Sequence, residues 1–316
     1  MVTSMLLYCL LICQIPAYIM SLLVISKENL RSIVEVKAVL SDMDGTLLNS
    51  HHAVSHSSLE TIKRLREENV LFFPATGRTR KSAIDAAGQS FVELFGNNLE
   101  SIPGVFSQGL VVYGKNGHLI YERFIDENAL AISEDFFSKE NMAIVAYAGD
   151  RIFCQKRSPQ ALKVCDYGDP EPEEFPSGLK NLLQSGISVN KLIVLAEQET
   201  LVNVRPQAEE LLKGKATITT AVPGMMEILP YGASKGEGVR ILLEHFSISP
   251  ENVIAFGDGE NDIEMLKYVG VGVVMENGKP ELKKGADLST LSNDDDGVAF
   301  GINIILESVK NCKVSA

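Results

Sequence analysis

The chain has 316 residues, 45% hydrophobic and 22% charged, a composition typical of a globular protein with material for one large domain or two smaller ones. Its 29 Lys and Arg residues against 41 Asp and Glu give a formal net charge of −12, which disfavours a general nucleic-acid surface. An anionic small substrate would need local cations or a metal to hold it.

The N-terminal stretch, residues 1–35, is set apart from the fold. Its first 26 residues carry no charge, and residues 5–25 are long and apolar enough to span a bilayer. Three interpretations stay open: a leader that lacks the usual basic region, a membrane anchor, or a start codon placed too far upstream, because Gln14 and Pro16 interrupt the run. Membrane contact is expected only through residues 5–25, if these are retained.

The five cysteines are scattered and odd in number, which favours reduced thiols over a disulfide framework. We therefore expect the folded part in a reducing compartment such as the cytoplasm. The N-terminal stretch leaves delivery to an organelle or a membrane open.

Residues 36–83 predict a strand, a helix and a second strand. The runs at 36–41 and 70–76 are short, apolar and rich in strand-forming residues. Between them, residues 57–69 predict an amphipathic helix with three apolar side chains on one face: Leu59, Ile62 and Leu65. This order is typical of a βαβ unit with parallel strands.

The middle of the chain has a different pattern. Two strand-like runs within 109–124 flank Asn116-Gly117, a strong hairpin signal. Three further strand-like runs alternate with helical stretches: 142–149, 191–197 and 216–221. Residues 84–230 therefore predict an α+β unit inserted into a parallel α/β domain.

The βα alternation returns after residue 230. The expected elements are a helix at 235–246, a strand at 253–257, a helix at 260–268, a strand at 270–275 and a helix near 278–285. Residues 36–83 and 231–316 would together form the parallel-sheet domain.

Acidic residues follow two of the predicted strands directly. Asp42 and Asp44 come after the first strand and, being two apart in extended chain, should face one site. Asp258 follows a late strand, and Asp262 lies one helical turn beyond it. Turn chemistry or a favourable helix start could each explain one cluster alone. If the two strands are neighbours, however, the carboxylates converge and need a cation, and oxygen ligands suit Mg²⁺.

Four segments resemble, in order and separation, the motifs of the haloacid dehalogenase (HAD) superfamily: DMDGTLL (42–48), PATGR (74–78), GASKGEGV (232–239) and GDGENDIEML (257–266). The late segment NDDDGVAFGI (293–302) resembles the end of its Cof-like branch. The resemblance implies an α/β fold, with a Rossmann-like parallel-sheet core and an α/β cap at 84–230. Such a cap closes over the active site and excludes water.

The resemblance also implies roles for individual residues. Asp42 would be the nucleophile that forms an aspartyl-phosphate, and Asp44 the general acid and base. Mg²⁺ would be held by Asp42, Asp44 (through its backbone carbonyl), Asp258 and Asp262. Thr76 and Lys235 would bind the transferring phosphoryl group, and Lys235 would also stabilise the nucleophile. The implied substrate contacts are Thr76, Gly77, Arg78, Lys235 and Asn261, with Asn261 orienting Lys235 or touching phosphate.

Simpler structural interpretations compete with these roles. Thr76 could cap the next helix and Arg78 could be a surface residue, whereas Lys235 at a helix start opposes the dipole and so favours function. Gln108 stands where many family members have Asn, which puts a substrate contact there in doubt. Glu227 could meet a polyol or be an ordinary strand residue. A polar loop holds three histidines that are more often solvated than metal-binding: His51, His52 and His56.

The sequence thus predicts a Mg²⁺-dependent phosphatase for a small phosphorylated metabolite, with sugar phosphates as the leading class. A phosphomannomutase-like phosphotransferase and a non-catalytic phosphate-binding protein stay as alternatives. A nucleotide kinase or GTPase is disfavoured because no G-x-x-x-x-G-K-[ST] loop occurs. Neither a nucleic acid nor a stable protein partner is implied.

Overall fold

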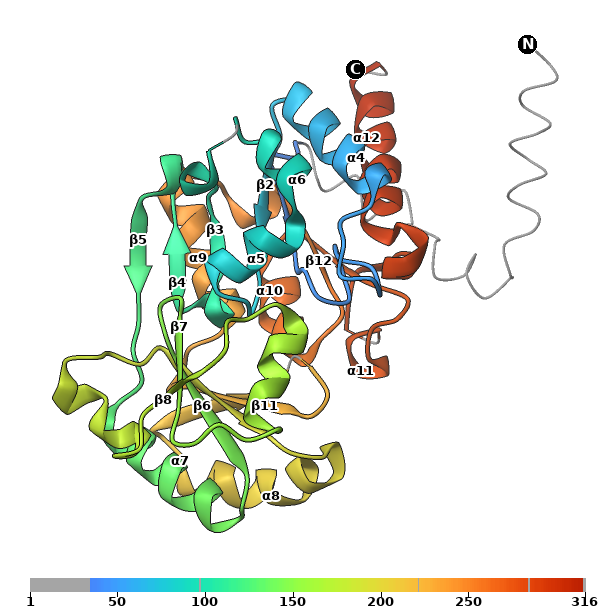
Figure 1. The fold of residues 1–316 in the computed structure, drawn as a ribbon. Helices are drawn as coiled ribbons and strands as arrows, with labels where there is room; N and C mark the ends of the chain where they lie inside the picture. Colours follow the sequence, from blue (N-terminus) through green and yellow to red (C-terminus); the bar gives the residue numbers. More distant parts are fainter. Residues whose placement is uncertain (1–34, 97, 221, 284, 315–316) are drawn as a thin grey trace.

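The computed structural model describes residues 35–314 except 97, 221 and 284 (Figure 1). The apolar stretch at 5–25, with the choice between leader, anchor and extension, lies outside these residues. Within the described part, no helix combines the length and hydrophobicity that crossing a bilayer requires.

A five-stranded parallel sheet lies at the centre of the first unit (Figure 1). Its strands, in spatial order, are β14 (Leu288–Ser289), β13 (Val271–Val274), β12 (Val253–Gly257), β1 (Ala38–Ser41) and β2 (Leu71–Pro74). β1 pairs in parallel with both β2 and β12. The predicted βαβ unit and its neighbouring late strand are therefore confirmed.

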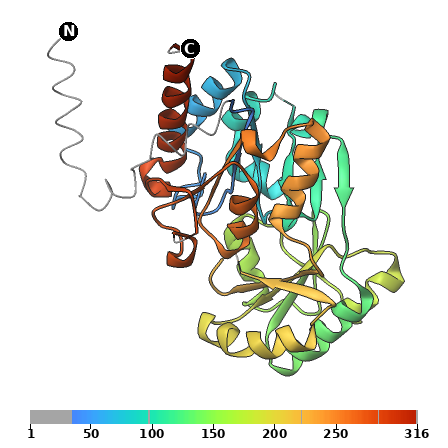
Figure 2. The same cartoon turned by 180° about the vertical axis from the view of Figure 1, so that it is seen from behind.

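Helices cover both faces of this sheet (Figures 1 and 2). The main ones are α4 (His56–Glu67), α9 (Lys235–Phe246), α10 (Ile263–Tyr268) and α12 (Gly297–Val314), and the shorter ones are α5 (Arg80–Ala87), α6 (Gln89–Glu93) and α11 (Pro280–Lys283). Successive strand side chains point to opposite faces. Val39 accordingly packs in a cluster with α4 and α12, and Leu40 in a cluster with α9 and α10.

The helix predicted at 235–246 is α9, with the same bounds, whereas the other predicted helices of this unit begin or end at different residues. The predicted helix at 260–268 is a 3₁₀ turn (Glu260–Asp262) followed by α10. Its first turn is tight because the Asp262 carboxylate accepts hydrogen bonds from the backbone amides of Asp258 and Gly259, both at 2.9 Å. The helix expected near 278–285 is only the single turn of α11.

The second unit is a six-stranded sheet with helices on one face. Its strands, in spatial order, are β10 (Ala216–Thr219), β11 (Met225–Pro230), β9 (Lys191–Leu195), β6 (Ala143–Ala148), β7 (Arg151–Cys154) and β8 (Glu173–Glu174). α7 (Glu127–Lys139) and α8 (Gln198–Leu211) cover the outer face, and the other face is turned toward the first unit (Figure 1).

The Asn116-Gly117 hairpin forms as predicted but packs on the first unit. It joins β4 (Val111–Tyr113) to β5 (Leu119–Glu122), next to β3 (Gly104–Phe106). Val105 and Val112 share a hydrophobic cluster with Val239 of α9.

The expected insertion at 84–230 is thus divided in the structure. Its first part, through β5, packs with the parallel sheet, and the hydrophobic core of the second unit begins at Ile125. The hairpin signal specifies a local turn and not the surface on which the hairpin packs. We therefore propose that the inserted unit spans about residues 125–229.

Candidate active site

The carboxyl ends of β1 and β12 bring three carboxylates together. The two strands pair in register, Ser41 beside Phe256, and the Asp42 amide donates to the Phe256 carbonyl at 3.0 Å. Asp42 and Asp258 therefore leave the sheet at the same edge. Carboxylate oxygens of Asp42, Asp258 and Asp262 all lie within 4.8 Å of one another.

The turn after Asp42 closes against this cluster. Gly45 has φ +76°, and a Cβ built there would lie 2.5 Å from Oδ2 of Asp258. Only glycine allows so close an approach in this left-handed conformation. The next residue, Thr46, donates its hydroxyl to Oδ1 of Asp258 at 2.8 Å.

Lys235 is the buried cation of the cluster. As the first residue of α9, it places its Nζ 2.8 Å from Oδ1 of Asp42 and 2.5 Å from Oδ1 of Asp262. The other oxygen of Asp262 is engaged by the two backbone amides of the 3₁₀ turn. Asp262 thus orients Lys235, and Asp42 and Asp258 keep more of their oxygen lone pairs for another ligand.

Burial and mutual repulsion shift the pKa values of these groups. Burial, followed by Asp262, raises the pKa of Asp42 well above its usual value, although Lys235 opposes the change. The same two causes raise the pKa of Asp258 to about 6. Burial alone would lower the pKa of Lys235, but Asp262 and Asp42 outweigh it and raise that pKa.

This donor set fits a divalent cation. Three carboxylates face one ammonium, so the cluster has an excess of negative charge that a cation would offset. Carboxylate oxygens are the ligands preferred by hard ions such as Mg²⁺ and Ca²⁺.

The Asp44 side chain lies outside the three-carboxylate cluster. Both of its oxygens accept from Arg78, from Nε at 2.7 Å and from Nη2 at 2.6 Å. Arg78 is buried, bonds Ser82 at 3.1 Å and also donates to the Tyr167 carbonyl of the second unit. The interpretation of Arg78 as an ordinary surface residue is therefore wrong. Asp42 and Asp44 line the same cavity between the two units, in agreement with the expectation that they face one site.

Thr76 and Gly77 lie at the end of β2, next to Arg78. Thr76 is fully buried and accepts a hydrogen bond from the Arg78 amide at 3.1 Å. It does not cap the following helix, because the N-cap of α5 is Thr79. The Gly77 carbonyl accepts from Lys191 Nζ of the second unit at 2.8 Å.

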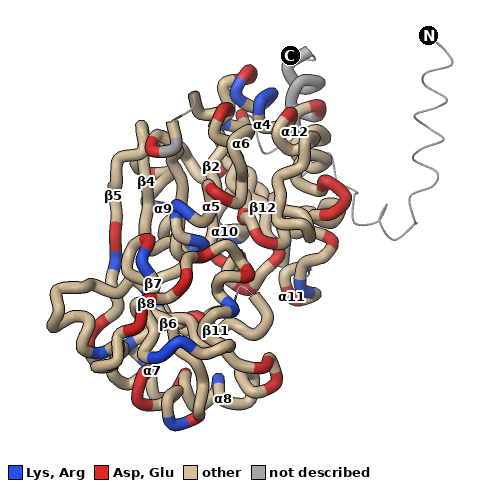
Figure 3. Tube along the Cα trace, in the orientation of Figure 1, with Lys and Arg blue, Asp and Glu red and all other residues tan. Residues whose placement is uncertain are grey.

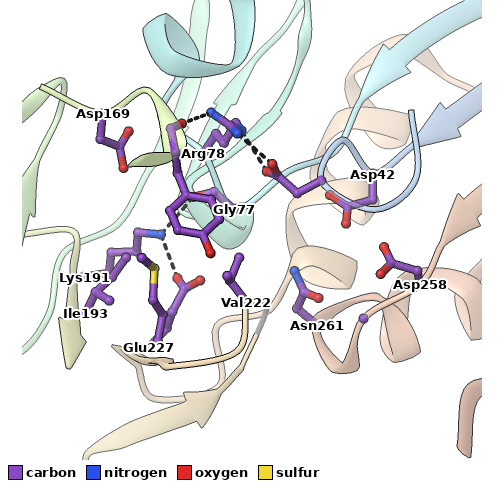
Figure 4. Close-up of a pocket in the computed structure, with 14 residues that line it drawn as sticks. Asp42, Gly77, Arg78, Asp169, Lys191, Ile193, Val222, Glu227, Asp258 and Asn261 are labelled. Atoms are coloured by element: carbon purple, nitrogen blue, oxygen red, sulfur yellow. Dashed lines mark hydrogen bonds and ion pairs between the residues drawn. The ribbon is translucent and has the colours of Figure 1, made fainter. Parts of the chain in front are cut away.

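A buried polar network connects the two units, and Figure 4 shows the part formed by Lys191 and Glu227. Glu227 accepts from Lys191 at 2.6 Å and from Gln108 at 2.8 Å. The Gln108 carbonyl oxygen in turn accepts from the Asn261 amide at 3.0 Å, while Gln108 has a left-handed backbone with φ +60°. Glu227 therefore already has hydrogen-bond partners within the protein. Asn261 donates to Gln108, but the Oδ1 atom of Asn261 is buried without a partner among the described residues.

A family model of haloacid dehalogenase-like hydrolases matches residues 39–302. The chain belongs to this family. The resemblance of its four motifs is therefore confirmed, and so is the predicted α/β fold with an additional α+β unit.

Curated relatives and solved structures agree with this membership. The chain is 34% identical over 268 residues to Arabidopsis thaliana "Endoribonuclease YBEY, chloroplastic", a match over 84% of this chain but only 45% of that protein. It is 28% identical to an HMP-PP phosphatase of Shigella flexneri, over 78% of this chain and 86% of the relative.

Two solved structures superpose over most of this chain. A haloacid dehalogenase-like hydrolase from Bacteroides thetaiotaomicron has a TM-score of 0.72 at 27% identity, over 86% of this chain and all of that one. A structure described as a HAD subclass IIB sugar phosphatase has a TM-score of 0.70 at 25% identity, over 84% of this chain and all of that one.

A cavity of about 50 Å³ separates the two units of this HAD-family hydrolase. Figure 4 shows Asp42 and Asp258 on one side and Asp169, Lys191 and Glu227 on the other. Oppositely charged segments intermingle where the units meet (Figure 3). Sequence reasoning missed six lining residues of the second unit, because no motif marks them: Tyr167, Asp169, Lys191, Ile193, Val222 and Met225. His51, His52 and His56 are exposed and outside the carboxylate cluster.

Proposed function

We propose that this HAD-family phosphatase is Mg²⁺-dependent and hydrolyses small phosphate monoesters, with sugar phosphates as the leading class. The observation that carries the proposal is the convergence of Asp42, Asp258 and Lys235, from separate parts of the chain, at one edge of the sheet. The similarity to an HMP-PP phosphatase and to a sugar phosphatase supports a small phosphorylated substrate.

The first step forms an aspartyl-phosphate. An Asp42 carboxylate oxygen attacks phosphorus, the bond from phosphorus to the ester oxygen breaks, and Asp44 gives its proton to that leaving oxygen. In the second step water attacks phosphorus, Asp44 takes the proton from the water, and inorganic phosphate leaves as Asp42 is restored. Lys235 holds the nucleophile. Arg78 donates to both oxygens of the Asp44 carboxylate in the structure, so in this proposal one of these contacts opens before Asp44 carries the proton that it transfers.

Asp42, Asp258 and the Asp44 backbone carbonyl would hold Mg²⁺. Asp262, also predicted as a ligand, is left out of this set because Lys235 and the backbone amides of Asp258 and Gly259 engage both of its oxygens. When bound, the ion offsets charge on the phosphoryl group and the carboxylates. In this proposal, the phosphoryl group of the substrate is also contacted by Thr76, Gly77 and Asn261.

The inserted unit acts as a cap. The cavity of about 50 Å³ has room for a few water molecules, so a sugar phosphate enters only when the two units move apart. Closure then excludes bulk water from the aspartyl-phosphate until the second step.

We also propose a reducing compartment for the folded part. Cys154 and Cys165 are free thiols in the structure, and the Arabidopsis relative is named chloroplastic. Whether residues 1–35 act as a leader or an anchor is tested by locating the full chain and sequencing its mature N-terminus.

The test uses the full-length chain, a panel of phosphate esters, and buffers with and without Mg²⁺. We expect phosphate release only with Mg²⁺, and a fall of at least about a thousandfold in Asp42→Asn. Asp135→Asn, an exposed residue of α7, is the matched control and should retain full activity.

Two other outcomes would replace the proposal. Isomerisation of a sugar monophosphate that requires an added bisphosphate, without net hydrolysis, would identify a mutase. Phosphate binding without turnover of any ester would identify a non-catalytic binding protein.

A further inference from the structure

The insertion lines the end of the cavity opposite Asp42 and Asp258, which is the end that would face the leaving group in the proposed reaction. The side chains that matter there are Asp169, Lys191, Met225 and Glu227. Lys191 and Glu227 are diagonal neighbours on one face of the insertion sheet, because Glu227 lies opposite Ile193 in the register of β9 and β11. Asp169 comes from the acidic loop that follows the 3₁₀ turn Ala161–Tyr167.

Lys191 is the single cation among the described insertion residues that line the cavity, and its ammonium already donates two hydrogen bonds. Its Nζ lies 2.6 Å from Glu227 Oε2 and 2.8 Å from the Gly77 carbonyl, and 4.9 Å from the centre of the Tyr147 ring. An ammonium has three donors, and two of them are used in these hydrogen bonds, while Glu227 offsets the charge and the Tyr147 ring lies close to it. Lys191 therefore offers little to a second anionic group on a substrate.

Asp169 offers an acceptor instead. Its Oδ2 accepts from the Tyr147 hydroxyl at 2.6 Å, which holds the carboxylate in place. Its Oδ1 is buried and has no hydrogen-bond partner among the described residues. A buried acceptor without a partner is unfavourable, and a hydroxyl or amine of a ligand would satisfy it. An anionic group at the same place would be repelled.

We infer that Asp169 is a specificity-determining residue that selects leaving groups with a hydroxyl or amine donor and without a second anionic group. The inference rests on the proposed phosphatase function and deepens it. It also disfavours the mutase alternative, because a sugar bisphosphate would place a second phosphate beside Asp169 and Glu227.

The experiment compares matched esters on the full-length chain with Mg²⁺. Glycerol 3-phosphate and 3-phosphoglycerate differ by a hydroxymethyl group against a carboxylate, and glucose 6-phosphate and 6-phosphogluconate form a second pair. We expect kcat/KM to be at least about tenfold higher for the uncharged member of each pair. p-Nitrophenyl phosphate, whose leaving group has no donor, reports the core chemistry separately.

Asp169→Asn tests the residue itself, since it removes the charge but keeps an oxygen for the Tyr147 hydroxyl. It should reduce the preference for the uncharged member of each pair by about tenfold or more. Its kcat/KM for p-nitrophenyl phosphate should stay within about threefold of that of the unmodified protein. Asp166→Asn, at an exposed residue of the same segment, is the control and should change neither the preference within the pairs nor kcat/KM for p-nitrophenyl phosphate.

The other outcomes distinguish failure of the selective role of Asp169 from failure of the proposed phosphatase function. Equal rates within the pairs, or an equal loss for all esters in Asp169→Asn, would remove the selective role while leaving the phosphatase intact. No hydrolysis of any ester, p-nitrophenyl phosphate included, would overturn the phosphatase proposal and this inference with it.

Discussion

At the residue scale, Lys235 holds the carboxylate cluster together. Lys235→Met keeps the length of the side chain but leaves Asp42 and Asp262 buried without their cation. We expect the free energy of unfolding to fall by about 3–5 kcal/mol and phosphate release to be lost. Urea unfolding measures the first effect. Lys267→Met, on the exposed side of α10, is the control, and its free energy of unfolding should stay within about 0.5 kcal/mol of that of the unmodified protein. Equal stability of the two variants would contradict the role of the buried pairs.

Asp258 makes stability depend on pH. Its pKa is raised to about 6, mainly by burial, whereas an unfolded Asp titrates near about 4. Between these values the folded state binds more protons than the unfolded state, so this carboxyl makes the protein less stable as pH rises through that window. The difference between the two pKa values corresponds to a loss of roughly 3 kcal/mol in the free energy of unfolding across this window.

Mg²⁺ should reverse this loss, because it binds the ionised carboxylate. We expect Mg²⁺ to raise the Tm more at about pH 7 than at about pH 5, and Asp258→Asn to lose most of that difference. Thermal unfolding of both proteins across the window, with and without Mg²⁺, measures the effect. Equal Mg²⁺ stabilisation at the two pH values would exclude Asp258 as a ligand.

At the element scale, close packing of α9 against the 3₁₀ turn Ser107–Gly109 sets the position of Lys235. A Cβ at Gly238 would lie 2.6 Å from the Gly109 Cα, so Gly238→Ala must push the helix away. We expect a loss of about 1–3 kcal/mol in stability, and a fall in kcat of about tenfold or more because the nucleophile's cation moves.

Glu244→Ala, on the exposed side of the same helix, is the control for Gly238→Ala. It should change unfolding by urea by no more than about 0.5 kcal/mol and leave kcat unchanged. A Gly238→Ala variant with normal stability and kcat would show that α9 has room to adjust.

At the scale of the whole molecule, contacts between the units favour the closed arrangement. Arg205 of α8 donates to both oxygens of Glu260 in the first unit, at 2.5 and 2.9 Å. Because this pair is partly exposed, Arg205→Ala should weaken closure by about 1 kcal/mol and raise KM about threefold to tenfold, with a smaller change in kcat.

Arg151→Ala removes a pair of similar geometry, with Glu173, that lies wholly within the insertion. Steady-state kinetics should therefore show no change in KM for Arg151→Ala. The same increase in KM for both variants would mean that insertion stability, and not closure, controls substrate binding.

Local patterns in the sequence determined the parallel sheet and the core of the site. Apolar runs and helical periodicity predicted β1, α4 and β2, and a change of pattern predicted a second unit. Asp42 and Asp258 directly follow strands, and residues at the carboxyl ends of neighbouring parallel strands meet at one sheet edge. Their proximity therefore needed only the correct strand order, which the family resemblance also implied.

The tertiary structure alone decided the contacts between segments far apart in the chain. Gln108 and Glu227 are 119 residues apart, and their contact depends on the register of the insertion sheet and on how the units dock. Arg78 binds both oxygens of the Asp44 carboxylate, and the hairpin at Asn116-Gly117 packs on the first unit. No local periodicity encodes such pairings, because side chains choose partners only after the backbone has brought distant segments together. The residues that we propose as catalytic could therefore be predicted from the sequence, whereas those that we propose to determine substrate specificity could not.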